Sequence, residues 1–260
     1  MQIKSKEDNE YSEFYDPRLV AIYNTVCPLD GYEKFYLELA KKLSAKTIID
    51  IGCGSGLLTS ELSKKGHQMI GIEPSRAMLG LARQTPQSEQ IQWIEGDALS
   101  LENFNADLAI MTGHVAQFHL EDDYWLNALT SIHNSLRPGG HLAFESRNPA
   151  VQPWVNQKEH KDWGSSTSPK KVVDPVAGEI EVWSEVIEIN GENVSFKIHY
   201  RFTKTGEELT SINTLKFRTK DEIIQSLEKA GFSIENVYGN WDWSLANNES
   251  PEFVFVAVRN

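Results

Sequence analysis

The chain has 260 residues, of which 40% are hydrophobic and 24% are charged, a composition typical of one large globular domain or of one domain with an insertion. Its net charge of -12 repels the phosphate backbone of DNA and RNA, so nucleic acids are not expected partners. No apolar run is long enough to span a bilayer, and the polar first eight residues lack the pattern of a secretory signal. We therefore expect a cytoplasmic protein without a membrane partner.

The first third of the chain predicts a helix and then a strand, a glycine loop and a second helix. Apolar residues at helical spacing predict an amphipathic helix over residues 31–43. The β-branched run at residues 47–51 predicts a strand, and it is followed directly by the glycines of residues 52–56. A helix is expected from Leu57, closed near Gly66. This order places a glycine-rich turn at the carboxyl end of a buried strand.

Strands and helices continue to alternate up to about residue 145. Further strands are expected at residues 68–72, 90–94, 106–111 and 140–145, with a helix over 122–136 before the last of them. Such alternation favours right-handed βαβ crossovers and a doubly wound, mostly parallel sheet. In this fold class, α/β, ligands bind in the crevice outside the carboxyl ends of the strands.

The alternation stops after residue 149 and resumes near residue 218. Alternating apolar residues around an Asn190-Gly191 turn predict an antiparallel β insertion of three strands. Thr219 and Glu222 form a capping box that starts another helix, and two last strands complete a seven-stranded sheet. The predicted division is an N-terminal segment (1–30), a cofactor-binding core (31–149 and 218–260) and the insertion (150–217). The insertion begins at the carboxyl end of the fifth strand, on the same edge as the crevice, and is therefore a candidate lid over the acceptor site.

The glycine loop indicates the cofactor. Its glycines alternate, and Asp50 precedes them, giving Asp50-Ile51-Gly52-Cys53-Gly54-Ser55-Gly56 rather than the G-x-G-x-x-G spacing of dinucleotide-binding proteins. This segment resembles the first motif of the class I S-adenosylmethionine-dependent methyltransferase family. The resemblance continues in order, because Glu73 ends the second strand and Gly96-Asp97-Ala98 follows the third.

The resemblance implies S-adenosylmethionine as cofactor. In the family, the acid at the position of Glu73 holds the ribose hydroxyls, and a carboxylate suits them because it accepts two hydrogen bonds. The position of Asp97 binds the adenine amino group, with the Ala98 backbone beside it. The residues expected to bind the cofactor are Asp50, Gly52, Cys53, Gly54, Gly56, Glu73, Pro74, Met78, Asp97, Ala98 and Met111.

The methyl acceptor is not specified by any motif. Methyl transfer from a sulfonium needs no acid for the leaving group, but a hydroxyl or ammonium acceptor would need a base. His114, just after the fourth strand, is the candidate base, although a loop histidine with its hydrogen bonds satisfied is the slightly favoured alternative. His119 is expected at the surface or on the approach to the next helix, and no metal site is expected. Candidate acceptor-binding residues are Tyr15, Arg147, Asn148, Trp154 and Tyr200, with packing as the alternative for each.

Three classes of function remain open. An acidic surface and an aromatic lid favour a methyltransferase acting on a small organic molecule by direct in-line transfer. A protein methyltransferase and a non-enzymatic cofactor-binding protein are the alternatives, and a nicotinamide oxidoreductase is disfavoured by the glycine spacing. The oligomeric state is not predicted.

Overall fold

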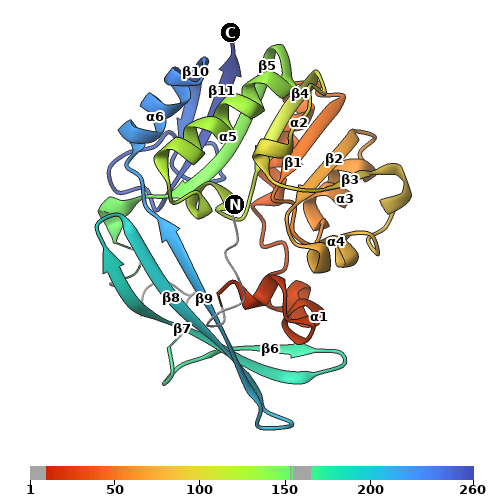
Figure 1. The fold of residues 1–260 in the computed structure, drawn as a ribbon, viewed down its shortest axis with the longest axis vertical. Coiled ribbons are helices and arrows are strands. Elements are labelled where there is room, and N and C mark those ends of the chain that lie inside the picture. The colour runs from red at the N-terminus through yellow and green to blue at the C-terminus, as the bar shows by residue number, and fades with distance from the viewer. Residues whose placement is uncertain (1–9, 153, 155–164) are drawn as a thin grey trace.

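A seven-stranded sheet forms the centre of the protein in a computed structural model, which describes residues 10–152, 154 and 165–260. The strand order is β10-β11-β5-β4-β1-β2-β3, and β1 to β5 run parallel while β11 is antiparallel to both of its neighbours. The strands are β1 (Thr47–Ile51), β2 (Gln68–Glu73), β3 (Gln92–Glu95), β4 (Ala106–Met111), β5 (Leu136–Arg147), β10 (Phe232–Tyr238) and β11 (Glu252–Arg259). The predicted doubly wound, mostly parallel sheet is confirmed (Figure 1).

Helices cover both faces of this sheet. Trp125, Ile132 and Leu227 belong to one apolar layer, while Phe35 and Leu62 belong to the layer on the other face. The sheet is therefore buried on both sides, as expected for parallel strands. The helices are α1 (Pro17–Val26), α2 (Glu33–Lys42), α3 (Leu57–Lys64), α4 (Arg76–Ala82), α5 (Asp122–Ser135) and α6 (Lys220–Lys229). Short 3₁₀ turns are η1 (Ser12–Phe14), η2 (Ser88–Gln90), η3 (Ala98–Ser100), η4 (Val115–Phe118) and η5 (Pro149–Val151).

Local sequence explains several of the helix starts. Ser75 caps α4 by accepting a hydrogen bond from the Met78 N–H, and Asp16 caps α1 just before a proline at the first helical position. The predicted capping box of Thr219 and Glu222 is present at α6. No helix of the described residues is both long and apolar enough to cross a membrane.

The insertion is a separate antiparallel sheet of four strands, ordered β6-β7-β8-β9. Its strands are β6 (Lys170–Asp174), β7 (Gly178–Asn190), β8 (Asn193–Phe202) and β9 (Glu208–Lys216). The expectation of three strands was wrong because β6 has no clear alternation and buries only Asp174. Pairing with β7, rather than its own residue pattern, makes this segment a strand.

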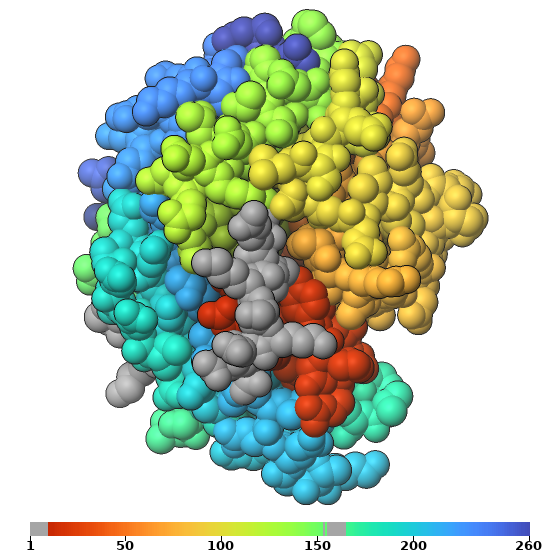
Figure 2. All heavy atoms as spheres, in the orientation of Figure 1, coloured from red at the N-terminus to blue at the C-terminus, as the bar shows by residue number. Residues whose placement is uncertain are grey.

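The N-terminal segment lies between the core and the insertion. Leu19, Ile22 and Val26 of α1 share an apolar cluster with Ile180 and Tyr200 of the insertion. Figure 2 shows the red atoms of this segment between the orange core and the cyan insertion. We call residues 10–27 together with 165–217 the cover, because the two parts pack as one body beside the carboxyl edge of the core sheet (Figure 1).

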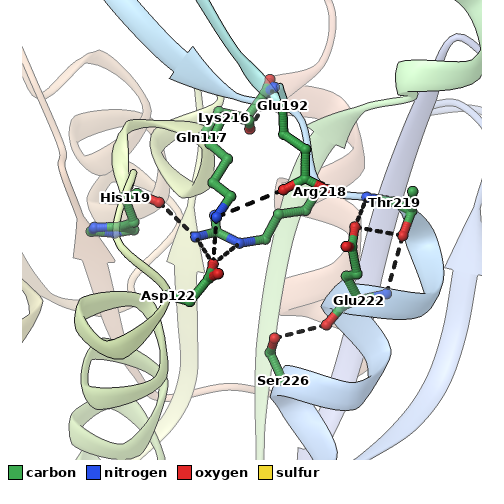
Figure 3. A network of polar contacts seen from close by, with 9 residues as sticks. All are labelled: Gln117, His119, Asp122, Glu192, Lys216, Arg218, Thr219, Glu222 and Ser226. Carbon is green, nitrogen blue, oxygen red and sulfur yellow. Dashed lines mark hydrogen bonds and ion pairs between the residues drawn. The ribbon is translucent and has the colours of Figure 1, made fainter. Parts of the chain in front are cut away.

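Ion pairs join the insertion to the core where β9 ends. Lys216 and Arg218 both donate to the Asp122 carboxylate at the start of α5, at 2.7 and 2.8 Å. Arg218, which is 4% exposed, also donates to the carbonyl oxygen of His119 at 2.8 Å. Figure 3 shows these contacts meeting at Asp122, with Glu192 and Glu222 at the edge of the same network. The network fixes the insertion at the end of the segment that follows β4.

Candidate functional site

The glycine loop after β1 is shaped by close packing and by left-handed backbone. Gly52 and Gly56 have φ angles of 70° and 74°, which side chains rarely adopt. A Cβ atom on Gly52 would lie 2.6 Å from Val115, and one on Gly56 would lie 2.7 Å from Trp93. The loop therefore requires glycine at both positions.

Asp50 is buried directly beneath this loop. Its side chain is 1% exposed, and the Thr59 hydroxyl donates to its Oδ2 atom at 2.6 Å. Its Oδ1 atom has no hydrogen-bond partner among the described residues. Burial raises the pKa of Asp50 to about 7, and the nearby Glu145 carboxylate adds to this shift. A buried carboxylate oxygen without a partner fits a ligand group that donates a hydrogen bond.

Glu73 ends β2 beside the loop. Its carboxylate accepts hydrogen bonds from the Ser75 N–H at 2.8 Å and from the Gly54 N–H at 3.1 Å. Burial raises its pKa to about 7, although both backbone donors act in the opposite direction. The carboxylate is thus held in one orientation, and its position beside the cavity is suited to accept hydrogen bonds from a pair of hydroxyl groups.

Asp97 and Ala98 follow β3 at the same edge. Asp97 caps η3 by accepting from the Leu99 N–H at 3.0 Å, and it also accepts a hydrogen bond from the Tyr124 hydroxyl of α5. Ala98 is 1% exposed. The two residues form one end of the site, on the opposite side of β1 from β4 in the strand order.

A cavity lies at this edge, with about 720 Å³ of empty space that includes open solvent at its mouth. The cover contributes three aromatic side chains to its wall, Phe14, Tyr15 and Tyr23, and Ser75 donates a hydrogen bond to the Phe14 carbonyl. No described residue of 150–217 lines the cavity. The core contributes Ile51, Gly52, Gly54, Glu73, Pro74, Asp97, Ala98, Thr112, Gly113, Val115, Phe118 and His119.

Seven of the residues predicted from sequence therefore meet in one wall: Tyr15, Gly52, Gly54, Glu73, Pro74, Asp97 and Ala98. The other predicted cofactor residues lie behind it. Met78 is fully buried, and its Cε atom lies 3.7 Å from where a Cβ on Gly54 would stand. Cys53 donates its N–H to Ile72, and Met111 is buried at the end of β4. Their roles, like those of the lining residues, stay predictions.

His114, the candidate base, is not among the cavity-lining residues. Its Nε2 atom lies 3.1 Å from the Glu252 carboxylate, and its backbone N–H donates to Glu145 at 2.8 Å. Its φ angle of 62° is the left-handed conformation that follows Gly113 in a tight turn. The imidazole is thus paired with a residue of β11, which fits the structural interpretation of this histidine better than the catalytic one.

The four other acceptor candidates also lie outside the cavity wall. Arg147 donates to Gln117, and Asn148 is 2% exposed and donates to the Ser250 carbonyl at 2.8 Å. Trp154 packs edge-on against Phe217 at 4.5 Å between ring centres, and Tyr200 is 4% exposed within the cover. Each makes the packing or hydrogen-bonding contacts of a structural residue, so their predicted contact with an acceptor has no geometric support.

Two residues were misjudged or missed from the sequence. His119 lies on the approach to α5, as one of the two expectations had it, but it is 5% exposed and lines the cavity rather than the surface. Glu145 is 1% exposed at the end of β5, where it accepts hydrogen bonds from the Tyr36 hydroxyl and the His114 N–H. An acid within the apolar run 142–145 was a signal for such a buried carboxylate. No group of three or more potential metal ligands occurs among the described residues.

These features define an α/β protein with a partly open, mainly apolar cavity at the carboxyl edge of a doubly wound sheet. Residues 48–140 match the model of a family described as a methyltransferase domain. The chain is 29% identical over 118 residues to a ubiquinone biosynthesis O-methyltransferase from Acinetobacter baumannii, covering 43% of this chain and 49% of that protein. The chain thus spans about half the length of the curated relatives it matches.

Solved structures match over nearly the whole chain. An S-adenosylmethionine-dependent methyltransferase from Clostridium acetobutylicum has a TM-score of 0.76 at 16% identity, covering 94% of this chain and 98% of that one. A sugar N-methyltransferase from a Streptoalloteichus species has a TM-score of 0.69 at 16% identity, covering 100% and 97%. At such identities the likeness shows the fold, which includes the cover. Residues 48–140 thus match a methyltransferase domain, and the chain as a whole has the fold of these solved methyltransferases.

Proposed function

We propose that the protein binds S-adenosylmethionine in this cavity and transfers its methyl group to a small organic molecule. The observation that carries the proposal is that Gly54, Glu73 and Asp97 line one cavity together with the aromatic side chains of the cover. When bound, the cofactor would supply a methyl group on a sulfonium, whose leaving group is a neutral thioether. The curated relative named for O-methylation and the sugar N-methyltransferase of similar fold support a small acceptor.

The residues of the wall have distinct tasks in this proposal. The Glu73 carboxylate, already oriented by two backbone N–H groups, accepts hydrogen bonds from the ribose hydroxyls. Asp50 lies behind the lining residues, where its Oδ1 atom has no partner among the described residues, and it accepts a hydrogen bond from the cofactor's ammonium group in this proposal. Asp97 and Ala98 receive the adenine. The donor set of the cofactor thus matches the acceptors that the wall offers.

The cover restricts the acceptor to a compound that fits beneath Phe14, Tyr15 and Tyr23. Aromatic walls exclude water from the reacting groups and favour the apolar or flat face of an organic ring. Proximity and orientation then provide most of the rate enhancement, since transfer to an oriented acceptor needs no acid. The net charge of -12 makes a nucleic-acid acceptor unfavourable.

The test is transfer of label from methyl-labelled S-adenosylmethionine into an extract separated by size. Label in the small-molecule fraction with the wild-type protein, and none with Asp50→Ala, is the expected result. Label confined to proteins would show that the acceptor is a protein rather than a small molecule. A second experiment is calorimetric titration with S-adenosylhomocysteine, the product formed from the cofactor. If the wild-type protein does not bind it, the assignment of S-adenosylmethionine as the cofactor is wrong.

A further inference from the structure

His119 is a polar residue of the cavity wall that the proposed function leaves without a task. It is 5% exposed, and neither Nδ1 nor Nε2 has a hydrogen-bond partner among the described residues. Burial lowers the pKa of its imidazole to about 3, and the positive charge of Arg218 acts in the same direction. The ring is therefore neutral at physiological pH, with one nitrogen that donates and one that accepts.

The surroundings hold this ring in a fixed position. It stacks on Tyr124 at 5.3 Å and on Trp125 at 5.6 Å between ring centres, with interplanar angles of 28° and 29°. The His119 carbonyl accepts a hydrogen bond from Arg218, whose guanidinium lies over the Trp125 ring. Figure 3 shows the carbonyl of His119 facing Arg218 while the imidazole points away from the network. Backbone and ring are thus both anchored, and the side chain cannot easily turn to find another partner.

Tyr124 locates His119 within the site. The Tyr124 hydroxyl donates to Asp97, and the Tyr124 ring stacks on His119, so the imidazole lies at the Asp97–Ala98 end of the cavity. The aromatic side chains of the cover and the turn at Gly113 also line the cavity. An unpaired polar group in a buried wall is unfavourable unless a ligand completes its hydrogen bonds. The described part of the chain supplies no such partner.

We propose that the His119 imidazole hydrogen-bonds the adenine base of the cofactor and is a specificity residue for the purine, in addition to Asp97. This inference rests on the proposed function, because it assumes the cofactor in this cavity. Adenine presents ring-nitrogen acceptors and an amino donor, and a neutral imidazole fixed by stacking pairs with either kind of atom. The ring remains neutral, so the contact persists through the physiological pH range.

Binding of S-adenosylhomocysteine and of adenosine to the full chain tests the inference by calorimetry. His119→Phe keeps the stacked ring but removes both nitrogens, and it should weaken both ligands by the same factor, about tenfold, as expected for one hydrogen bond. His119→Asn restores a donor and an acceptor and should recover part of the loss. His133→Asn is the matched control and should bind like the wild type, because His133, on α5, packs against Phe232 and does not line the cavity.

Nitrogen-15 NMR of the histidine rings distinguishes a hydrogen bond to the ligand from a packing role, because packing alone would not shift the ring nitrogens. Adding S-adenosylhomocysteine should shift one ring nitrogen of His119 while the ring stays neutral. Wild-type affinity in His119→Phe within twofold, or unmoved ring nitrogens, would overturn the inference and leave the proposed function intact. Failure of the wild type to bind S-adenosylhomocysteine would overturn both, so the two failures are distinguishable.

Discussion

The carboxyl edge of the core and the cover contribute to the same cavity by different means. On the core side, Asp50, Glu73 and Asp97 each stand within a few residues of the end of a strand, and the strands bring them together. On the cover side, Phe14 and Tyr23 reach the cavity only because α1 is packed on the insertion, about 150 or more residues away along the chain. Polar recognition is thus local in sequence, whereas enclosure depends on long-range packing.

The insertion supports the N-terminal segment. Its described residues do not line the cavity, but Ser211 and Asn213 of β9 donate hydrogen bonds to the buried Glu13 carboxylate of η1. These bonds and the apolar cluster around Ile22 hold the N-terminal segment over the site. The sequence predicted that the insertion is a lid over the acceptor. We now propose that the N-terminal segment is this lid and that the insertion holds it in place.

The largest effect is expected from the core side. Glu73→Ala removes an oriented carboxylate that would accept two hydrogen bonds, and it should weaken S-adenosylhomocysteine binding by at least about 100-fold in calorimetry, because hydrogen bonds to charged groups contribute about 1.5–3 kcal/mol each. Glu95→Ala is the matched control, since Glu95 pairs with Glu73 on the neighbouring strand but is exposed. Near-wild-type affinity in Glu73→Ala would remove the central support for the cofactor assignment.

The cover should respond in stability. Ile22 is 3% exposed in the cluster between α1 and the insertion, so Ile22→Ala should cost about 3 kcal/mol of unfolding free energy in urea titrations. It should also make the N-terminal segment more sensitive to limited proteolysis. Val176→Ala, at a residue that is 88% exposed, should change stability by less than about 0.5 kcal/mol. Equal effects of the two substitutions would argue against the cover as one packed body.

The pH dependence of cofactor binding reports on the buried acids. The pKa of Glu73 is raised to about 7 by burial, while the proposed ribose contact needs the ionised carboxylate. Binding at pH 6 must therefore release a proton, and affinity should rise up to about tenfold between pH 6 and pH 8. Calorimetry in buffers of different ionisation enthalpy measures the released proton. Glu73→Gln should reduce the rise to the part that Asp50 contributes, since the pKa of Asp50 is also raised to about 7, and a rise in affinity toward low pH would contradict the assignment.

The smallest effect is expected at His114. Its imidazole faces Glu252 rather than the cavity, so His114→Gln should leave S-adenosylhomocysteine affinity and methyl transfer within about twofold of the wild type. The measurement is label transfer from the methyl-labelled cofactor across pH 6 to 9. A loss of 100-fold or more, with a changed pH profile, would instead support His114 as the general base.

Sequence patterns were sufficient to predict the fold and the residues that the core contributes near the glycine loop. Short buried strands, the alternating glycines and Glu73 at a strand end predicted the sheet and the wall residues, because these signals are local. The number of strands in the insertion was wrong because β6 depends on pairing with β7. The acceptor candidates Arg147, Asn148, Trp154 and Tyr200 were chosen from their place near the expected crevice, but their side chains turn into other contacts.

The amino-acid sequence by itself determined that a glycine loop, two acids and an alternating α/β core would form a class I methyltransferase fold, since backbone conformation and strand periodicity are set by neighbouring residues. Only the tertiary structure decided which face each side chain presents and what it meets. His119 is the clearest case, because nothing near it in sequence indicates burial between Tyr124 and the cavity. Packing of α5 and the Arg218 anchor, which is 99 residues away, places that imidazole in the wall.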